Sequence, residues 1–255
     1  MRSPIKDSVN NFKCLRYLQE MIPPGSVFES FLFFGGELEF SLSQNKRFCV
    51  AHTNRYVVYE FWKCLMEDSE RVYNLCLNLQ PHLQNENTFY VFQEKWFGYK
   101  DPFVRSSLFF LLNRCSTSGL ISAGAQDYKN FTPFALSYLK NFNVQNFHLV
   151  LDEGKELAHA PGTTEHNSEY LLFPLGRYEY NFFEQGTNKG FEMTTVKHRS
   201  FCESLSDIEN NWIVLYKHHP EVHRLYKKYN IKMVDKYGRH TKEKDKCEDL
   251  IIANF

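Results

Sequence analysis

Residues 27–40 constrain the fold more than any other stretch of this sequence. They read VFESFLFFGGELEF, which is an apolar run containing Glu29, then a loop with two glycines, then an amphipathic segment. This order is typical of the first strand, the ligand-binding loop and the first helix of an open α/β sheet. However, Phe33 and Phe34 stand in the loop, where a nucleotide-like ligand would need bare backbone. We therefore predict an α/β fold whose first loop does not hold a cofactor.

The charge balance restricts how this protein can bind nucleic acid. The chain of 255 residues has 30 Lys and Arg residues and 30 Asp and Glu residues, so its formal net charge is zero. Proteins that bind nucleic acid through bulk charge carry a basic excess. Any phosphate contact is therefore expected to come from a local basic patch. The length allows one large α/β domain, or a domain with a substantial insertion.

Cysteine usage indicates a reducing compartment. The 7 cysteines are odd in number and no two of them form a CxxC pair. The sequence therefore predicts free thiols, with neither a disulfide framework nor a zinc site. The N-terminus lacks the apolar core of a signal peptide, and no apolar run is long enough to cross a bilayer. We expect a cytoplasmic protein with no membrane partner.

Apolar runs and helical spacing alternate through most of the chain. Six apolar runs are predicted as strands: residues 26–31, 47–51, 147–151, 169–174, 211–216 and 250–255. Helices are predicted at residues 12–21, 37–42, 57–65, 196–205 and 220–226, the fourth capped by Thr194 or Thr195 and the last beginning at Pro220. A lysine-rich loop is predicted before the last strand.

The middle of the chain is mostly helical and aromatic. Apolar residues recur at helical spacing over residues 72–79, 90–96 and 106–114, and residues 123–134 resemble a loop. We predict an α/β domain made of residues 1–66 and 147–255, and an inserted helical lobe made of residues 67–146.

Several short stretches together keep the order of a known family over nearly the whole chain. They are Arg2-Ser3-Pro4-Ile5, Ile22-Pro23 with Phe28-Glu29-Ser30-Phe31, Phe110-Leu111-Leu112-Asn113-Arg114 with Gly119, Phe131-Thr132-Pro133-Phe134, the helix at His198, and Asp249-Leu250-Ile251-Ile252-Ala253-Asn254-Phe255. This set resembles the Dam-type adenine-specific DNA methyltransferases of bacteria and phages. The resemblance implies a Rossmann-like S-adenosylmethionine-dependent methyltransferase fold, with the lobe similar to a DNA target-recognition domain.

The sequence departs from this family where members contact the cofactor. The family has a Gly-Gly-Lys after its opening, but residues 6–11 contain no glycine. The glycine-rich cofactor loop has bulky Phe33 and Phe34 here, and its glycines, Gly35 and Gly36, come late. The family has an acidic residue at the end of the second strand, and His52 stands at or beside that position here.

A fourth departure falls on the catalytic motif. The family has Asp-Pro-Pro-Tyr at the end of the catalytic strand, where the acid accepts hydrogen bonds from adenine and the ring stacks on the flipped base. The counterpart here is Phe173-Pro174-Leu175-Gly176. It offers neither an accepting side chain nor a stacking ring.

These losses predict a degenerate, non-catalytic homologue. No catalytic residue and no cofactor are expected, and the emptied pocket would be lined by Glu29, Phe33, Phe34, Gly35, Gly36 and His52. The protein would act as a binding or assembly subunit in a bacterial cell or an infected host cell. Its partner would be a protein, such as an intact methyltransferase relative or a larger assembly, and DNA is a further candidate. Two alternatives stay open: an active DNA adenine methyltransferase with diverged motifs that uses S-adenosylmethionine, and a structural component of a larger assembly such as a phage particle.

Two regions are candidates for nucleic-acid contact. Residues 224–246 hold nine basic residues against three acidic ones, with tyrosines interleaved. Such a run is commonly a solvated face, but it can also contact phosphates. The second region is on the lobe that resembles a recognition domain. The candidates are Lys227, Lys228 and Arg239 in the first region, and Arg114, Ser116 and Lys129 in the second.

Two further patterns resemble known sites but lack essential parts. His219 and His223 have the spacing of a metal-binding helix, but Pro220 lies between them and the glutamate of a zinc protease is missing, so a solvated helix start is expected. Residues 152–155, Asp-Glu-Gly-Lys, could be a displaced catalytic motif, but they lack the prolines and the aromatic residue. We expect no metal.

Overall fold

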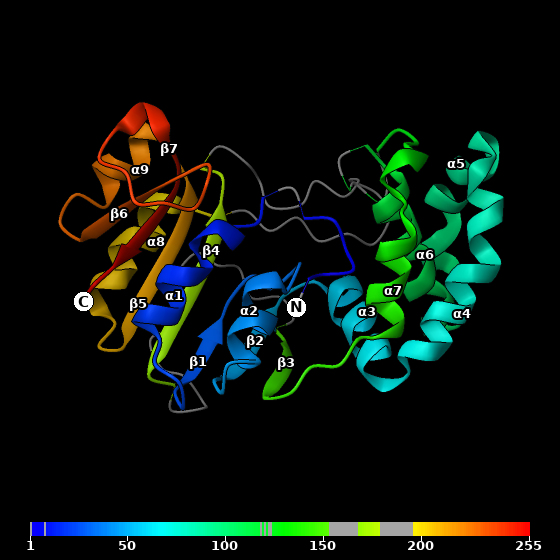
Figure 1. Ribbon diagram of the computed structural model, residues 1–255, viewed down its shortest axis with the longest axis horizontal. Helices are drawn as coiled ribbons and strands as arrows, with labels where there is room; N and C mark the ends of the chain where they lie inside the picture. The colour runs from blue at the N-terminus through cyan, green and yellow to red at the C-terminus, as the bar shows by residue number, and fades with distance from the viewer. Residues whose placement is uncertain are drawn as a thin grey trace.

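The strands form one mixed sheet in a computed structural model that describes residues 2–7, 9–117, 119, 121, 124–152, 168–178 and 196–255. They are β1 (Val27–Ser30), β2 (Phe48–Thr53), β3 (Phe147–Leu151), β4 (Tyr170–Gly176), β5 (Asn211–Lys217), β6 (Asn230–Asp235) and β7 (Cys247–Ala253). Their order is β3-β2-β1-β4-β5-β7-β6 (Figure 1). The first five strands are parallel, and β7 is antiparallel to both β5 and β6. This topology confirms the predicted Rossmann-like methyltransferase fold.

The central strands are buried on both faces, which explains their nearly continuous apolar sequence. Along β4, Leu171 and Phe173 pack with α8 (His198–Ser204) and α9 (Pro220–Leu225). Leu172 points the opposite way, into the cluster that contains α1 (Leu15–Met21) and α2 (Glu37–Ser43). The alternation follows from the two-residue period of a strand. Helices therefore cover both faces of the sheet.

A group of helices occupies the segment predicted as an inserted lobe. After α3 (Tyr56–Glu67) come α4 (Ser69–Leu79), α5 (Glu86–Lys95), α6 (Pro102–Cys115) and α7 (Pro133–Lys140), on the right in Figure 1. In α6 the residues from Ser106 to Asn113 are all buried, as expected of a helix enclosed by its neighbours. Apolar side chains of these helices share one hydrophobic cluster with side chains of the sheet. The division into two domains stays a prediction.

Four of these helices begin at residues whose side chains accept a hydrogen bond from the first turn. Such caps satisfy backbone N–H groups that have no partner within the helix. The capping residues are Asp68 for α4, Asn85 for α5, Asp101 for α6 and Thr132 for α7. Local sequence thus fixes where each helix starts.

Three sequence-based predictions need correction. Residues 123–134 were predicted as a loop, but α7 begins at Pro133. The lysine-rich segment before the last strand contains β6, an edge strand whose polar side chains conceal its pattern. The helix predicted from residue 196 begins at His198, after Lys197, which makes no side-chain cap. The predicted capping threonines, Thr194 and Thr195, lie outside the described residues.

The structure also bears on thiols and membrane crossing. All seven cysteines are buried and free, which confirms the absence of disulfides. In the described part of the chain, no helix has the length and apolarity needed to span a membrane.

Candidate functional site

The candidate site lies where the strand order reverses, between β1 and β4. In doubly wound sheets, ligands bind in the crevice outside the carboxyl ends of the strands at this switch point. Here the loop of residues 31–36 leaves β1 and turns towards β2, because the N–H of Phe33 donates to the carbonyl oxygen of His52 at 2.8 Å. The side chains at this crevice decide what it can bind.

A buried charged triplet connects three strands at this edge. Glu29 comes from β1, His52 from β2, and Asp152 directly follows β3. Nε2 of His52 lies 3.2 Å from a carboxylate oxygen of Glu29, and Nδ1 lies 3.0 Å from Oδ2 of Asp152. The hydroxyl of Ser168 donates to the other oxygen of Glu29 at 2.6 Å. Both imidazole nitrogens thus face carboxylates.

This arrangement favours the protonated form of the histidine. Burial by itself would lower the pKa of His52, but the hydrogen bonds and charges of Asp152 and Glu29 outweigh it and raise the pKa to about 9. At neutral pH an imidazolium therefore lies between two carboxylates. A cation occupies the position where the resemblance to Dam-type methyltransferases predicted an acid.

The triplet predicts a loss of stability at alkaline pH. The pKa of His52 is raised in the folded state, so its contribution is complete below about 6.5, the unfolded value, and disappears as pH rises through about 9. The full contribution is about 3 kcal/mol. We expect urea unfolding from pH 6 to pH 10 to show this loss, with a smaller slope in His52→Gln. An imidazole NMR signal of His52 that titrates near 6.5 would contradict the prediction.

A column of stacked rings covers the tip of β4. The Phe31 ring stacks on the His52 imidazole, with centroids 4.7 Å apart, and on the Phe173 ring, with centroids 5.0 Å apart. Phe173 also meets Phe201 of α8 edge to face. Phe173, Leu175 and Gly176 are buried and Pro174 is partly buried. The predicted degenerate motif therefore presents apolar surface, and Phe173 belongs to the core.

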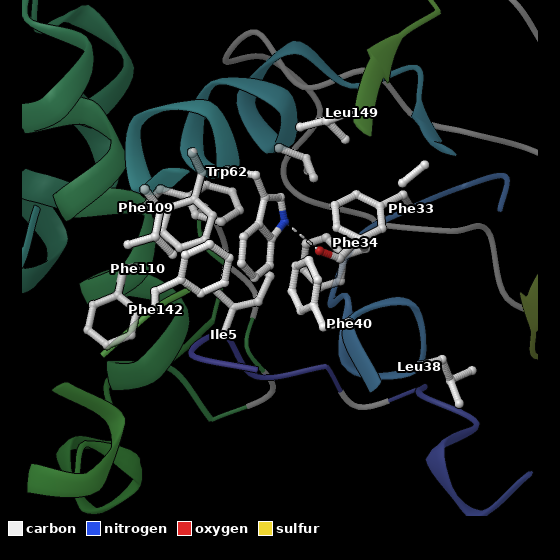
Figure 2. Packing of buried hydrophobic residues seen from close by; sticks show 14 of the residues in the cluster. Ile5, Phe33, Phe34, Leu38, Phe40, Trp62, Phe109, Phe110, Phe142 and Leu149 are labelled. Carbon is white, nitrogen blue, oxygen red and sulfur yellow. Dashed lines mark hydrogen bonds between the residues drawn. The ribbon is translucent and has the colours of Figure 1, made fainter. Parts of the chain in front are cut away.

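The two phenylalanines of the loop point into the protein. The Phe33 ring packs against the rings of Phe40, Trp62 and Phe147, with centroids 5.4–5.8 Å apart. Figure 2 shows Trp62 beside Phe33 and Phe40, with its Nε1–H donating to the carbonyl oxygen of Phe34 at 2.8 Å. The guanidinium of Arg55 lies 4.7 Å from the centroid of the Phe34 ring. The loop is thus anchored by its own aromatic side chains.

The loop glycines make room for side chains of the protein itself. A Cβ on Gly35 would lie 2.9 Å from Oδ2 of Asp7, and one on Gly36 would lie 2.3 Å from the Phe40 ring. Gly36 also has a φ of +72°, which favours glycine. In a cofactor loop, such glycines let a ligand approach the backbone. Here Asp7 and Phe40 take that space.

The remaining cavity is small. It measures about 40 Å³ and is bordered by the N-terminal segment, the loop, α2 and Pro174. Pockets that hold drug-sized ligands measure roughly 300–1,000 Å³. Burial raises the pKa of Asp7 and of Glu39, and the 2.7 Å hydrogen bond that Glu39 accepts from Ser30 offsets this shift only in part. This cavity by itself is too small for S-adenosylmethionine.

The candidate residues for nucleic-acid contact differ in whether their side chains are exposed or bound to the protein's own backbone. Arg114 donates to the carbonyl oxygens of Ser3 and Pro4, and Ser116 is buried with its hydroxyl donating to the carbonyl oxygen of Asn113. These two residues hold the chain's own backbone, and their role as nucleic-acid contacts stays a prediction. The others are exposed: Lys129, Lys227, Lys228 and Arg239.

The structure describes the histidine pair, His219 and His223, and one residue of the acidic turn at residues 152–155. Nδ1 of His219 accepts a hydrogen bond from the N–H of Glu221, so this histidine caps α9. Within the residues that the structure describes, no cluster of His, Cys, Asp and Glu could hold a metal ion. Of the turn at residues 152–155, only Asp152 lies within the described residues.

Sequence reasoning placed Glu29 and His52 in one pocket but missed the second partner of His52, Asp152. Asp152 was visible as an acidic residue after an apolar run, and the register of β2 with β3 places it beside His52. The position of Asp152 beside His52 could be predicted only if that register were known, because pairing of these parallel strands brings together residues about a hundred positions apart in the sequence. Phe31 was assigned to the strand, with no role in covering β4.

Comparisons with known proteins are consistent with the fold but weak. The sequence matches no family model and no curated protein. Three solved structures resemble the chain. A TehB-like SAM-dependent methyltransferase from Corynebacterium glutamicum has 7% identity and a TM-score of 0.40, over 96% of this chain and 87% of that one. A SAM-dependent methyltransferase from Aquifex aeolicus has 8% identity and a TM-score of 0.37, over 97% of this chain and 95% of that one. The glycopeptide N-methyltransferase MtfA has 6% identity and a TM-score of 0.42, over 98% of this chain and 91% of that one. At these scores the likenesses carry no argument, and the fold assignment rests on the strand order.

Proposed function

We propose that this protein has a methyltransferase fold but does not methylate, and that it serves as a binding or assembly subunit. The observation that carries the proposal is the filled crevice. The triplet of Glu29, His52 and Asp152, together with the inward-pointing Phe33 and Phe34, occupies the switch point of the sheet. The assignment to a degenerate relative of Dam-type DNA adenine methyltransferases rests on the sequence resemblance.

The chemistry of methyl transfer supports the same conclusion. The resemblance implies an acidic residue at the end of the second strand that would hold the donor's ribose, whereas His52 stands there, protonated and engaged in ion pairs with Glu29 and Asp152. Enzymes lower their barriers by positioning and electrostatic stabilisation of the reacting groups. The buried Phe173 side chain cannot accept a hydrogen bond from an adenine amino group.

A binding role is supported by the surface of the helical segment. Large apolar side chains that are at least a third exposed concentrate there, and such groupings mark interaction surfaces. Within the described residues they are Leu77, Tyr90, Val91, Phe97, Tyr99 and Phe134. We propose a protein partner for this surface, either an intact methyltransferase or a larger assembly.

Calorimetric titration with S-adenosylmethionine tests the proposal. We expect no saturable heat at millimolar ligand, and no label in plasmid DNA incubated with the protein and radiolabelled donor. An active adenine methyltransferase in the same buffer serves as the positive control. Micromolar binding, or methylated adenine in the plasmid, would instead support an active enzyme with diverged motifs.

A further inference from the structure

An exposed basic turn connects β6 to β7. This turn comprises residues 236–246, KYGRHTKEKDK. We propose that it binds single-stranded nucleic acid without sequence preference, with Tyr237 as a stacking platform and the flanking cations as phosphate contacts. The proposal goes beyond the proposed function, because it does not depend on whether the crevice binds a methyl donor.

Tyr237 is exposed in a way that packing does not explain. Its side chain is 71% exposed, more than any other large apolar residue of the described chain except Phe134. Nζ of Lys236 lies 5.0 Å from its ring centroid, and Cζ of Arg239 lies 5.8 Å from it. A ring that is open to solvent and flanked by cations is the arrangement with which proteins stack unpaired bases beside their phosphates.

The turn that presents this ring is held in one conformation. Oδ1 of Asp235 accepts from the N–H groups of Tyr237 and Arg239, both at 2.8 Å. Two backbone bonds close the turn, from Gly238 to Asp235 and from Asp235 to Arg239. Gly238 has a φ of +77° and packs against the backbone of Lys13. The platform is therefore preorganised, which reduces the entropy lost on binding.

The turn has a surplus of three positive charges, because its five cations, Lys236, Arg239, Lys242, Lys244 and Lys246, outnumber the two acids Glu243 and Asp245. Glu243 pairs with Lys246 at 2.8 Å, and the carboxylate of Asp235 is used by backbone N–H groups. Among the described residues no ion pair is recorded for the other cations of the turn, all of them exposed: Lys236, Arg239, Lys242 and Lys244. The net surplus lies at one edge of a protein whose formal net charge is zero. A polyanion is the complementary partner.

The geometry separates this turn from two other predicted contacts. β6 runs in the direction of β5, since β7 is antiparallel to both, so the turn lies at the carboxyl edge of the sheet. Lys227 and Lys228 precede β6 and lie at the opposite edge, about 20 Å away for a strand of 6 residues. Of the three candidates that the sequence predicted in the basic run of residues 224–246, only Arg239 belongs to the proposed surface.

The composition favours single strands over duplexes and membranes. Bases in a duplex are already stacked, so a lone ring gains contact only with unpaired ones. A membrane-binding segment needs an apolar face to enter the lipid. Residues 236–246 contain no large apolar side chain besides Tyr237.

Fluorescence anisotropy with a labelled oligothymidylate of about 20 nucleotides tests this surface, as single domains cover roughly 4–16 nucleotides. We expect saturable binding at low salt that weakens as salt rises. Tyr237→Ala should weaken binding about 5- to 150-fold. The double variant Lys236→Ala, Arg239→Ala should reduce the slope of log K against log salt by about 1.4. Circular dichroism would verify that the variants fold.

Matched controls on α5 decide whether the effect belongs to the turn. Tyr90→Ala and Lys95→Ala remove an exposed ring and an exposed cation from another surface, and should leave affinity unchanged. The proposal is overturned by no binding at low salt, by equal losses in the α5 variants, or by binding that ignores Tyr237→Ala. Equal affinity for a duplex, or binding only to vesicles of anionic phospholipid, would also overturn it. None of these outcomes bears on the titration with S-adenosylmethionine.

Discussion

Replacing His52 by alanine is expected to lower the free energy of unfolding by about 3–5 kcal/mol. The substitution removes the one cation between Glu29 and Asp152 and leaves two carboxylates facing each other at the buried end of the sheet. Breaking a buried ion pair costs more than the pair contributes, because the remaining charge stays desolvated. The Phe31 ring also loses one of its two stacking partners and keeps the other, Phe173. Urea unfolding followed by circular dichroism at pH 7 measures the loss.

His82→Ala is the matched control, because this histidine is exposed on the helical segment. Its effect should stay within about 0.5 kcal/mol, as for most surface substitutions. The His52 variant should regain stability as pH falls towards the range where carboxylates accept protons. A loss below about 1 kcal/mol for His52→Ala would mean that the triplet does not stabilise the fold.

The parts of the fold that sequence predicted well are those with strong local signals. The run from Trp212 to Tyr216 is nearly all apolar because β5 is buried on both faces, and the strand was recognised for that reason. Pro220 was expected at the start of a helix and begins α9. The Rossmann-like fold, by contrast, was predicted from the family resemblance, and the order of the strands was not predicted, since no local pattern specifies which strands pair.

The missed elements show where local patterns fail. β6 carries Asn230, Lys232 and Asp235 on an edge of the sheet, so burial did not force an apolar run. The start of α7 was signalled by Thr132 before Pro133, a capping residue followed by a proline at the first helical position. That signal was read as part of a loop because the residues before it are polar.

The sequence revealed which motif residues of the site are missing, but not which contacts replace them. The substitution of His52 for an acid and of Phe173 for the catalytic acid could be seen in the sequence. The ion pairs that compensate for the first change depend on strand register, and Asp152 lies 100 positions from His52. Likewise, Gly35 and Gly36 looked like remnants of a cofactor loop, but their space is taken by Asp7 and Phe40. Tertiary packing therefore decides what a retained motif residue does.

Replacing Phe33 by alanine is expected to destabilise the protein by about 3–5 kcal/mol. In the Dam-type methyltransferases that the sequence resembles, this loop is rich in glycine, so a merely vestigial side chain would be dispensable. Here the ring is 1% exposed and packs among Phe40, Trp62 and Phe147. Its removal leaves a cavity that the anchored loop cannot close, because Trp62 holds the carbonyl of the next residue. Urea unfolding of the variant measures the cost.

Phe134→Ala is the control, since that ring is 73% exposed and its loss should change stability by about 0.5 kcal/mol or less. A cost below about 1 kcal/mol for Phe33→Ala would show that the loop does not depend on the ring. The variant also separates two reasons for a closed crevice. Because the imidazolium of His52 and the buried Phe173 remain, we expect Phe33→Ala to gain no calorimetric heat with S-adenosylmethionine. Saturable binding in this variant alone would mean that one aromatic ring, rather than the charge and shape of the whole crevice, excludes the donor.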